Sequence, residues 1–214
     1  KIQAAAARCD QVLKAWSIWT RNQNDPQSRI DQADAAFDAR WANAEDEAAM
    51  GNVDCADMTL SAGDMKALMD TAIDEIVLEV TEGLNLRSRK QATCGAKILR
   101  SAATMCRQLL RAESRYIGDL SRDPDGATRD AVQAKASSQF GHQWDQTTRK
   151  HCPTNATKEE IKGDVVALND DVVTNVTVSP NVPDDAFMAM THPAGGEPGN
   201  EVSYAGDTLV PQCQ

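Results

Sequence analysis

The sequence predicts an all-helical protein, and three observations lead to that prediction. Aromatic residues make up only 4% of the chain while alanine is abundant, and this composition favours closely packed helices because strands prefer β-branched and aromatic side chains. Apolar residues recur with the 3.6-residue period of a helix, most clearly between Met65 and Val80. Residues typical of helix starts and helix ends flank several of these periodic segments.

We expect helices at about residues 2–22, 27–49, 62–82, 88–120, 126–149 and 157–176. Asp25–Pro26 starts the second helix, because aspartate accepts a hydrogen bond from an unpaired N–H and proline fits the first helical position. Ser61 with Asp64 opens the third helix as a loose form of the capping box, and Gly83 ends that helix.

The second half of the chain has corresponding features. No proline interrupts the segment from Arg87 to Tyr116, so the fourth helix is expected to be the longest, although Gly95 weakens its first turns. Asp123–Pro124 starts the fifth helix by the same chemistry as the earlier Asp–Pro step. Thr157 and Glu160 form a capping box that opens the sixth helix.

These features repeat in the same order along the chain. Cys9 and Cys55 are 46 residues apart, and so are Cys106 and Cys152. Each pair of cysteines encloses an Asp–Pro step and then a Phe and a Trp four residues apart, and a capped apolar helix follows. The aromatic pairs are Phe37 with Trp41 and Phe140 with Trp144. The repeat predicts two tandem three-helix units, residues 1–84 and 85–177, each closed by its own disulfide.

Residues 178–214 differ in composition from the rest of the chain, because proline and glycine are frequent there. We expect an irregular tail in place of a third unit. The six cysteines are even in number and scattered, without a C-x-x-C motif, which is typical of disulfides formed outside the cytoplasm. If equivalent cysteines form equivalent bonds, Cys9 pairs with Cys55 and Cys106 with Cys152, and Cys94 is left to pair with Cys213 and anchor the tail.

The charge of the chain excludes two classes of partner. The net charge is −10 and the isoelectric point is about 4.7, which argues against nucleic acid and against an anionic membrane surface, because both attract Lys and Arg. No apolar stretch is long enough to cross a bilayer. Because the chain begins at Lys1 without a methionine, we expect a processed, exported form.

The order of motifs resembles a family of cysteine-containing helical repeats in exported proteins of myxobacteria and related deltaproteobacteria. The matching segments are the Ala- and Lys-rich helix from Cys94 to Cys106, the helix with Phe37 and Trp41, and the segment from Cys55 through Asp64 to Val80. The resemblance spans about residues 5–176 and implies an exported helical protein. It implies no activity and no catalytic residue.

Candidate metal ligands occur at two places. Met188, Met190 and His192 alternate in the tail, which is a spacing of soft ligands used for copper, and the alternative is that they pack against the body of the protein. Acidic pairs at Asp170–Asp171 and Asp184–Asp185 offer oxygen ligands for calcium, but they lack the spacing of an EF-hand and also fit a solvated surface. We therefore expect no cofactor.

No motif of catalysis is present, and His142 and His151 are not spaced to share one helix face. Trp16, Trp19 and Tyr116 belong either to the core or to a binding face. The first hypothesis is an exported, non-catalytic structural or interaction scaffold that binds a protein partner or assembles with itself. The alternatives are an accessory subunit of an exported redox or metal-handling complex, and an enzyme built from dispersed acids.

Overall fold

The computed structural model describes residues 1–51, 60–149 and 152–177, and in these residues every regular element is an α-helix. The helices are α1 (Ile2–Asn22), α2 (Gln27–Met50), α3 (Ala62–Thr81), α4 (Arg89–Gly118), α5 (Ala127–Thr148) and α6 (Lys158–Thr177). The all-helical prediction is confirmed for these residues, each predicted helix lies within two residues of its expected bounds, and α4 is the longest of the six.

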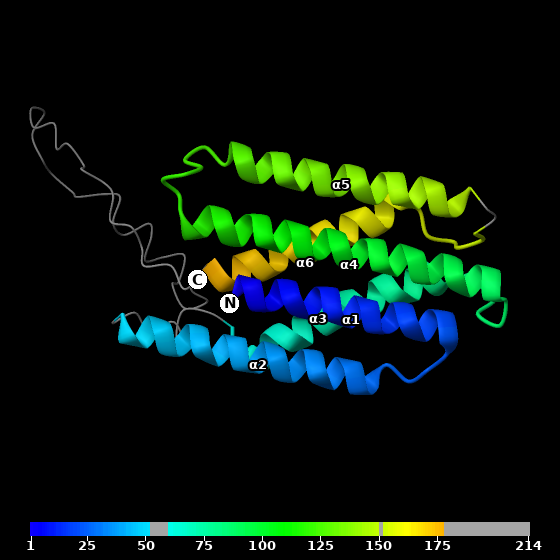
Figure 1. Ribbon diagram of the computed structural model, residues 1–214, viewed down its shortest axis with the longest axis horizontal. Coiled ribbons are helices and arrows are strands. Elements are labelled where there is room, and N and C mark those ends of the chain that lie inside the picture. Colours follow the sequence, from blue (N-terminus) through cyan, green and yellow to red (C-terminus); the bar gives the residue numbers. More distant parts are fainter. Residues whose placement is uncertain (52–59, 150–151, 178–214) are drawn as a thin grey trace, which may run out of the picture.

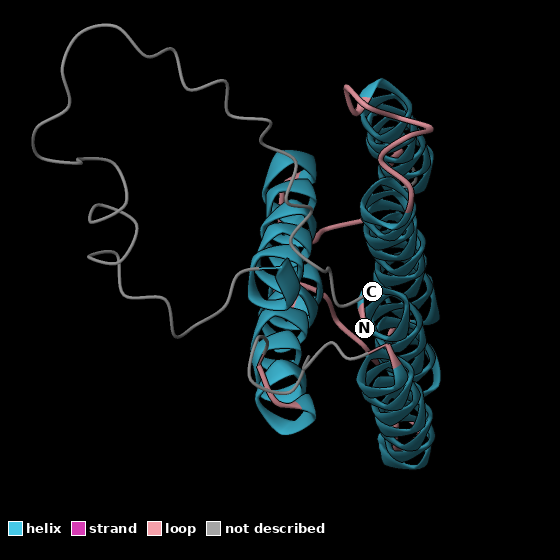
Figure 2. Cartoon of the chain, turned by 90° about the vertical axis from the view of Figure 1, so that its left-hand side faces the viewer, coloured by secondary structure: helices cyan, strands magenta, loops and turns pink. Residues whose placement is uncertain are grey.

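The helices form two layers (Figures 1 and 2). In the first layer α2, α1, α4 and α5 lie side by side in that order, and α3 and α6 pack together as a second layer. The helix α4 contacts α1 and α5 beside it and α3 and α6 behind it. The exposed side of α4 therefore faces away from the second layer.

The centre of the first layer is the antiparallel pair of α1 and α4. Two contacts set its direction: Cys9 lies opposite Cys106, and the Ser17 hydroxyl donates a hydrogen bond of 2.8 Å to the carbonyl of Ala96. Small buried residues line this seam and let the helix axes approach closely. They include Ala5, Ala6, Gly95, Ala102 and Ala103.

The two predicted aromatic pairs lie in the core. Phe37 and Trp41 on α2 are buried with ring centroids 5.1 Å apart, and Phe140 and Trp144 on α5 are buried with centroids 5.9 Å apart. A spacing of four residues places both rings on the inward face of the helix, as expected. One continuous hydrophobic core includes residues from all of the helices. Trp16 packs against this core and is half-buried.

The helix starts follow the predicted capping chemistry in three places. The Ser61 hydroxyl accepts from the Asp64 N–H, and Thr157 and Glu160 form the reciprocal bonds of a capping box. Asp25 accepts from the N–H of Gln27. Helix α5 differs, because it begins at Ala127 after Gly126, which adopts a left-handed φ of 72°.

Asp123 still supports the start of α5, although it precedes the helix by several residues. Its carboxylate accepts hydrogen bonds from the backbone N–H groups of Thr128 and Arg129 at 2.8 and 2.9 Å. These bonds favour the charged form and hold the pKa of Asp123 below its usual range. The Asp–Pro step therefore caps α5 across a tight turn, at a longer range than the sequence predicts.

The predicted disulfide pairing is wrong. Cys9 bonds to Cys106, and Cys94 bonds to Cys152, so none of the predicted pairs Cys9–Cys55, Cys106–Cys152 and Cys94–Cys213 forms. The reason is the packing of α1 against α4, which brings Cys9 and Cys106 face to face with Cα atoms 6.5 Å apart. This bond joins the two predicted units to each other and does not close either of them.

Two of the six cysteines, Cys55 and Cys213, lie outside the described residues, as does the whole predicted tail. Among the described helices, none combines the length and the apolar character needed to cross a membrane.

Candidate functional site

Helix α4 concentrates positive charge in an acidic protein. It contains seven Lys and Arg residues and a single carboxylate, that of Glu113, whereas the net charge of the whole chain is −10. Arg89, Thr93, Lys97 and Arg100 follow one another at intervals of four, four and three residues. At that spacing their side chains share one face of the helix.

This face of α4 forms one wall of a groove, and the C-terminal half of α5 forms the other. The groove has an open volume of about 1240 Å³, and none of its lining residues is acidic. Five of its side chains are cationic, and we call this feature the cationic groove. The cations are Arg89, Lys90, Lys97, Arg100 and Arg149.

Polar side chains fix the floor of the cationic groove. The Ser101 hydroxyl donates to the Gln143 side-chain oxygen at 2.6 Å and joins α4 to α5. The hydroxyls of Thr93 and Thr104 donate to backbone carbonyls one turn earlier in α4, at 2.6 and 3.0 Å. These hydroxyl oxygens can still accept hydrogen bonds, and the Gln143 amide can donate one, so the floor is suited to a polar ligand.

The five cations are all exposed, and within the described part of the chain none of them forms an ion pair. Some cations elsewhere do form ion pairs, such as Lys14 with Asp10 and Lys158 with Asp145. The N-terminal end of α4 lies at the cationic groove and contributes the positive end of the helix dipole. The result is a local positive potential, and no carboxylate among the described lining residues neutralises it.

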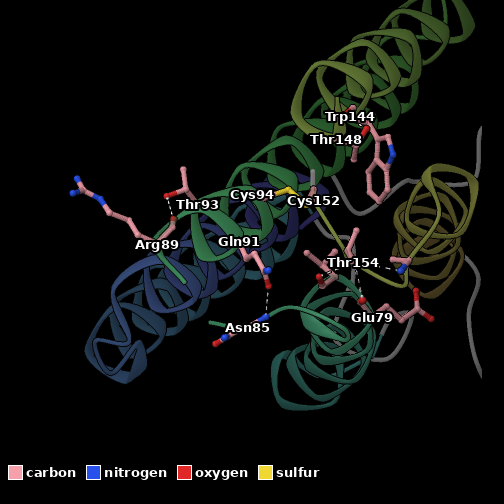
Figure 3. Close-up of a disulfide and its surroundings, with 12 residues drawn as sticks. Glu79, Asn85, Arg89, Gln91, Thr93, Cys94, Trp144, Thr148, Cys152 and Thr154 are labelled. Carbon is pink, nitrogen blue, oxygen red and sulfur yellow. Dashed lines mark hydrogen bonds between the residues drawn. A yellow bond between two sulfur atoms is a disulfide. The ribbon is translucent and has the colours of Figure 1, made fainter. Parts of the chain in front are cut away.

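A disulfide braces this part of the molecule (Figure 3). Cys94, which also lines the groove, bonds to Cys152 in the connection between α5 and α6, with Cα atoms 5.8 Å apart. The residues that follow Cys152 are tied to the end of α3, because the Thr154 hydroxyl donates to the carbonyl of Val80 and the Asn155 N–H to that of Glu82. The groove is thus built on a crosslinked frame.

Of the predicted metal ligands, the structure describes only Asp170 and Asp171. Met188, Met190, His192, Asp184 and Asp185 lie outside the described residues. Asp170 and Asp171 lie on α6, where Asp170 accepts a hydrogen bond from the Asn169 amide. Over the described ranges, no group of three His, Cys, Asp or Glu side chains has an arrangement that could hold a metal ion.

The sequence analysis missed the cationic groove because it considered the charge of the chain as a whole. The local signal was present, since seven cations and one acid within a single predicted helix depart strongly from a net charge of −10. The contribution of α5 could not be anticipated, because Gln143 and Arg149 acquire their place only when α5 folds back along α4.

Comparisons with known proteins found no relative of this chain. No family model, no curated protein and no solved structure matches the chain. The described part of the chain is thus defined by its own features, which are an all-helical two-layer fold, the disulfides Cys9–Cys106 and Cys94–Cys152, and a cationic groove.

Proposed function

We propose that this protein is an exported, non-catalytic interaction scaffold, a component of a larger assembly, and that the cationic groove binds an acidic partner protein. The observation behind the proposal is the set of five exposed cations on a crosslinked frame, none of which forms an ion pair with another described residue. Unpaired like charges on a rigid surface repel one another, and a ligand with carboxylates relieves that repulsion.

A polypeptide suits the groove better than a nucleic acid does. Single-stranded nucleic acids are usually held by stacking on aromatic rings, and no aromatic residue lines the groove. Amide and hydroxyl groups such as those of Gln143 and Ser101 pair readily with the carboxylates and peptide groups of an acidic polypeptide.

The other parts of the proposal have independent support. Disulfides between distant helices are typical of proteins outside the cytoplasm, which supports export. Matched features in the two halves support a duplicated three-helix unit. A buried Phe–Trp pair lies on α2 and another on α5, and a side-chain cap begins α3 and another begins α6. Membership of the deltaproteobacterial helical repeat family remains part of the same proposal.

The test is the binding of a fluorescent oligoglutamate peptide, followed by its anisotropy. We expect wild-type protein to bind the peptide, with an affinity that falls as salt increases, because exposed charge pairs are screened. The double variant Lys97→Glu/Arg100→Glu reverses two adjacent groove cations. It should weaken binding by about tenfold or more, which corresponds to about 1.4 kcal/mol.

A matched control is available on the same helix. Arg111 and Arg115 are also exposed on α4 but do not line the groove. The variant Arg111→Glu/Arg115→Glu changes the net charge by the same amount and should bind the peptide within about twofold of wild type. Equal loss of binding in both variants would mean that overall charge, and not the groove, attracts the peptide.

A further inference from the structure

The second layer presents a surface whose charge is opposite to that of the groove. The exposed residues Asp74, Glu75 and Leu78 of α3, and Glu82 directly after its end, follow one another along one side, opposite the buried face of the helix. We call them the acidic ridge. Leu78 is 68% exposed, and in the described structure none of the three carboxylates forms an ion pair.

The acidic ridge and the cationic groove have similar lengths. The helical rise of 1.5 Å per residue gives about 12 Å between Asp74 and Glu82 and about 16 Å between Arg89 and Arg100. Both surfaces lie mainly along helix faces and have charges of one sign, for which the described residues provide no ion-pair partner. The ridge also offers an apolar side chain, and the aliphatic stems of Lys97 and Arg100 are a suitable surface for it.

The two surfaces cannot meet within one molecule. The groove lies on the exposed side of α4 and α5, whereas α3 belongs to the second layer behind them (Figure 2). The exposed side of α3 faces away from the first layer, because its buried residues, including Met69 and Ile73, pack into the shared core. A contact between ridge and groove therefore requires two copies of the chain.

We propose that the acidic partner of the cationic groove is a second copy of this protein, which inserts its acidic ridge. This inference rests on the proposed function, because it names the partner of the same groove. The contact is heterologous, since it joins two different surfaces. After such a contact one copy still has a free ridge and the other a free groove, so further copies can extend the pair into an open chain or close it into a ring.

Salt should affect this assembly in a characteristic way. Each copy has a net charge of −10, so copies repel one another over long distances, whereas the contact pairs attract over a few ångströms. At about 0.15 M salt the Debye length of about 8 Å screens the long-range repulsion more than the contact pairs. At about 1 M salt the length falls to about 3 Å, and the contact should dissociate.

The experiment is charge-swap complementation, measured by sedimentation velocity of the full chain at about 0.15 M salt and protein concentrations on the order of 100 µM. Wild type is expected to associate. Asp74→Lys/Glu75→Lys and Lys97→Glu/Arg100→Glu should each sediment as monomers, because each reversal places like charges where the wild-type contact pairs opposite ones. An equimolar mixture of the two variants should associate again.

The variant Arg111→Glu/Arg115→Glu should associate like wild type, and circular dichroism should show the same helix content for all variants. Monomeric wild type, or a mixture that stays monomeric while wild type associates, would overturn the inference. If wild type is monomeric but still binds oligoglutamate through the groove, the proposed function stands and only the identity of the partner is wrong. If it also fails to bind oligoglutamate, both proposals fall.

Discussion

Two carboxyl groups share a confined space between α3 and α6. The pKa of Glu79 is raised from its ordinary value of 4.5 to about 7, first by burial and then by the nearby Asp164, which accepts a hydrogen bond from the protonated form and repels the charged one. Glu75 and Glu160 add smaller repulsions. With both groups ionised, one oxygen of Glu79 and one of Asp164 are buried without a partner among the described residues.

Glu79→Gln should therefore stabilise the protein in a way that depends on pH. The folded state binds the Glu79 proton more tightly than the unfolded state, so the free energy of unfolding falls as pH rises from about 4.5 to about 7. Because Glu79 is only half-buried, we expect a gain of about 1 kcal/mol at pH 8 after allowance for solvent screening. Urea unfolding at several pH values measures it, and an equal gain at pH 4 and pH 8 would contradict the explanation.

Arg8 is a buried cation that joins three helices. Its side chain is fully buried on α1 and forms ion pairs with Asp34 on α2 at 2.8 Å and Asp70 on α3 at 2.7 Å. The two carboxylates are themselves 31% and 47% exposed. Loss of the cation thus leaves solvated carboxylates, whereas loss of the carboxylates leaves a buried, unpaired charge.

This asymmetry predicts that Asp34→Asn/Asp70→Asn destabilises the protein more than Arg8→Met does. We expect the double variant to cost about 3–5 kcal/mol, because it leaves Arg8 without its charge partners, and Arg8→Met to cost less than half of that. Urea unfolding at pH 7 gives both values, with Asp38→Asn, which removes the more exposed pair with Lys66, as a control of at most about 1 kcal/mol. A larger cost for Arg8→Met than for Asp34→Asn/Asp70→Asn would contradict this prediction.

At the scale of the helices, two glycines should respond in opposite ways to the same substitution. A Cβ atom on Gly95 would lie 2.7 Å from the Cδ1 of Leu84 and 3.1 Å from the Cγ2 of Thr20, which is fully buried in the seam between α1 and α4. A Cβ atom on Gly163 of α6 would have no atom within 4 Å.

Gly163→Ala should thus raise the free energy of unfolding by about 0.5–1 kcal/mol, because alanine restricts the unfolded chain and favours the helix. The same gain at Gly95 should be outweighed by the displacement of Thr20 and Leu84, so Gly95→Ala is expected to be destabilising by about 1–2 kcal/mol. Thermal unfolding of the two variants tests the pair, and a shift of both melting temperatures in the same direction would contradict it.

The helices could be predicted from the sequence because their determinants are local. Caps such as Ser61 and Thr157 act within three residues, and the apolar period is visible within a few turns. Disulfide pairing depends on which helices pack together, and that information is not local. Repeated segments that pack face to face bring equivalent residues into contact, so a repeat is as compatible with a Cys9–Cys106 bond as with separate bonds.

The candidate site could be predicted from the sequence only in part. The cationic stripe of α4 from Arg89 to Arg100 follows from helical spacing alone and could be predicted. The open groove beside it could not, because it depends on the antiparallel return of α5 and on the bond between Ser101 and Gln143. The acidic ridge likewise required knowledge of which side of α3 is buried.

At the scale of the whole molecule, the two disulfides of the described residues contribute differently to the structure. The Cys9–Cys106 bond crosses the centre of the first layer, where buried helix packing already holds α1 against α4. The Cys94–Cys152 bond lies at the edge of the cationic groove and holds the connection between α5 and α6, close to Arg149. Peptide mapping of the unreduced protein should recover both crosslinks.

Removal of either bond should lower stability, but only removal of the Cys94–Cys152 bond should weaken peptide binding. In the chain-entropy model the two bonds, which span 97 and 58 residues, contribute about 4–5 kcal/mol each as an upper value. We expect Cys9→Ser/Cys106→Ser to lower the free energy of unfolding but to bind oligoglutamate normally while folded, because helix packing keeps α4 in place. Cys94→Ser/Cys152→Ser should lower stability and also weaken peptide binding several-fold, because the wall of the groove loses its brace.

Urea unfolding and anisotropy titration of the two double variants give both quantities for each bond. The loops closed by the bonds overlap in the sequence, so removal of both should cost less than the sum of the separate effects. Equal peptide affinity in the two variants would mean that the groove does not need the Cys94–Cys152 bond to keep its shape. In that case the contacts of Thr154 and Asn155 with the end of α3 would be sufficient to position the connection.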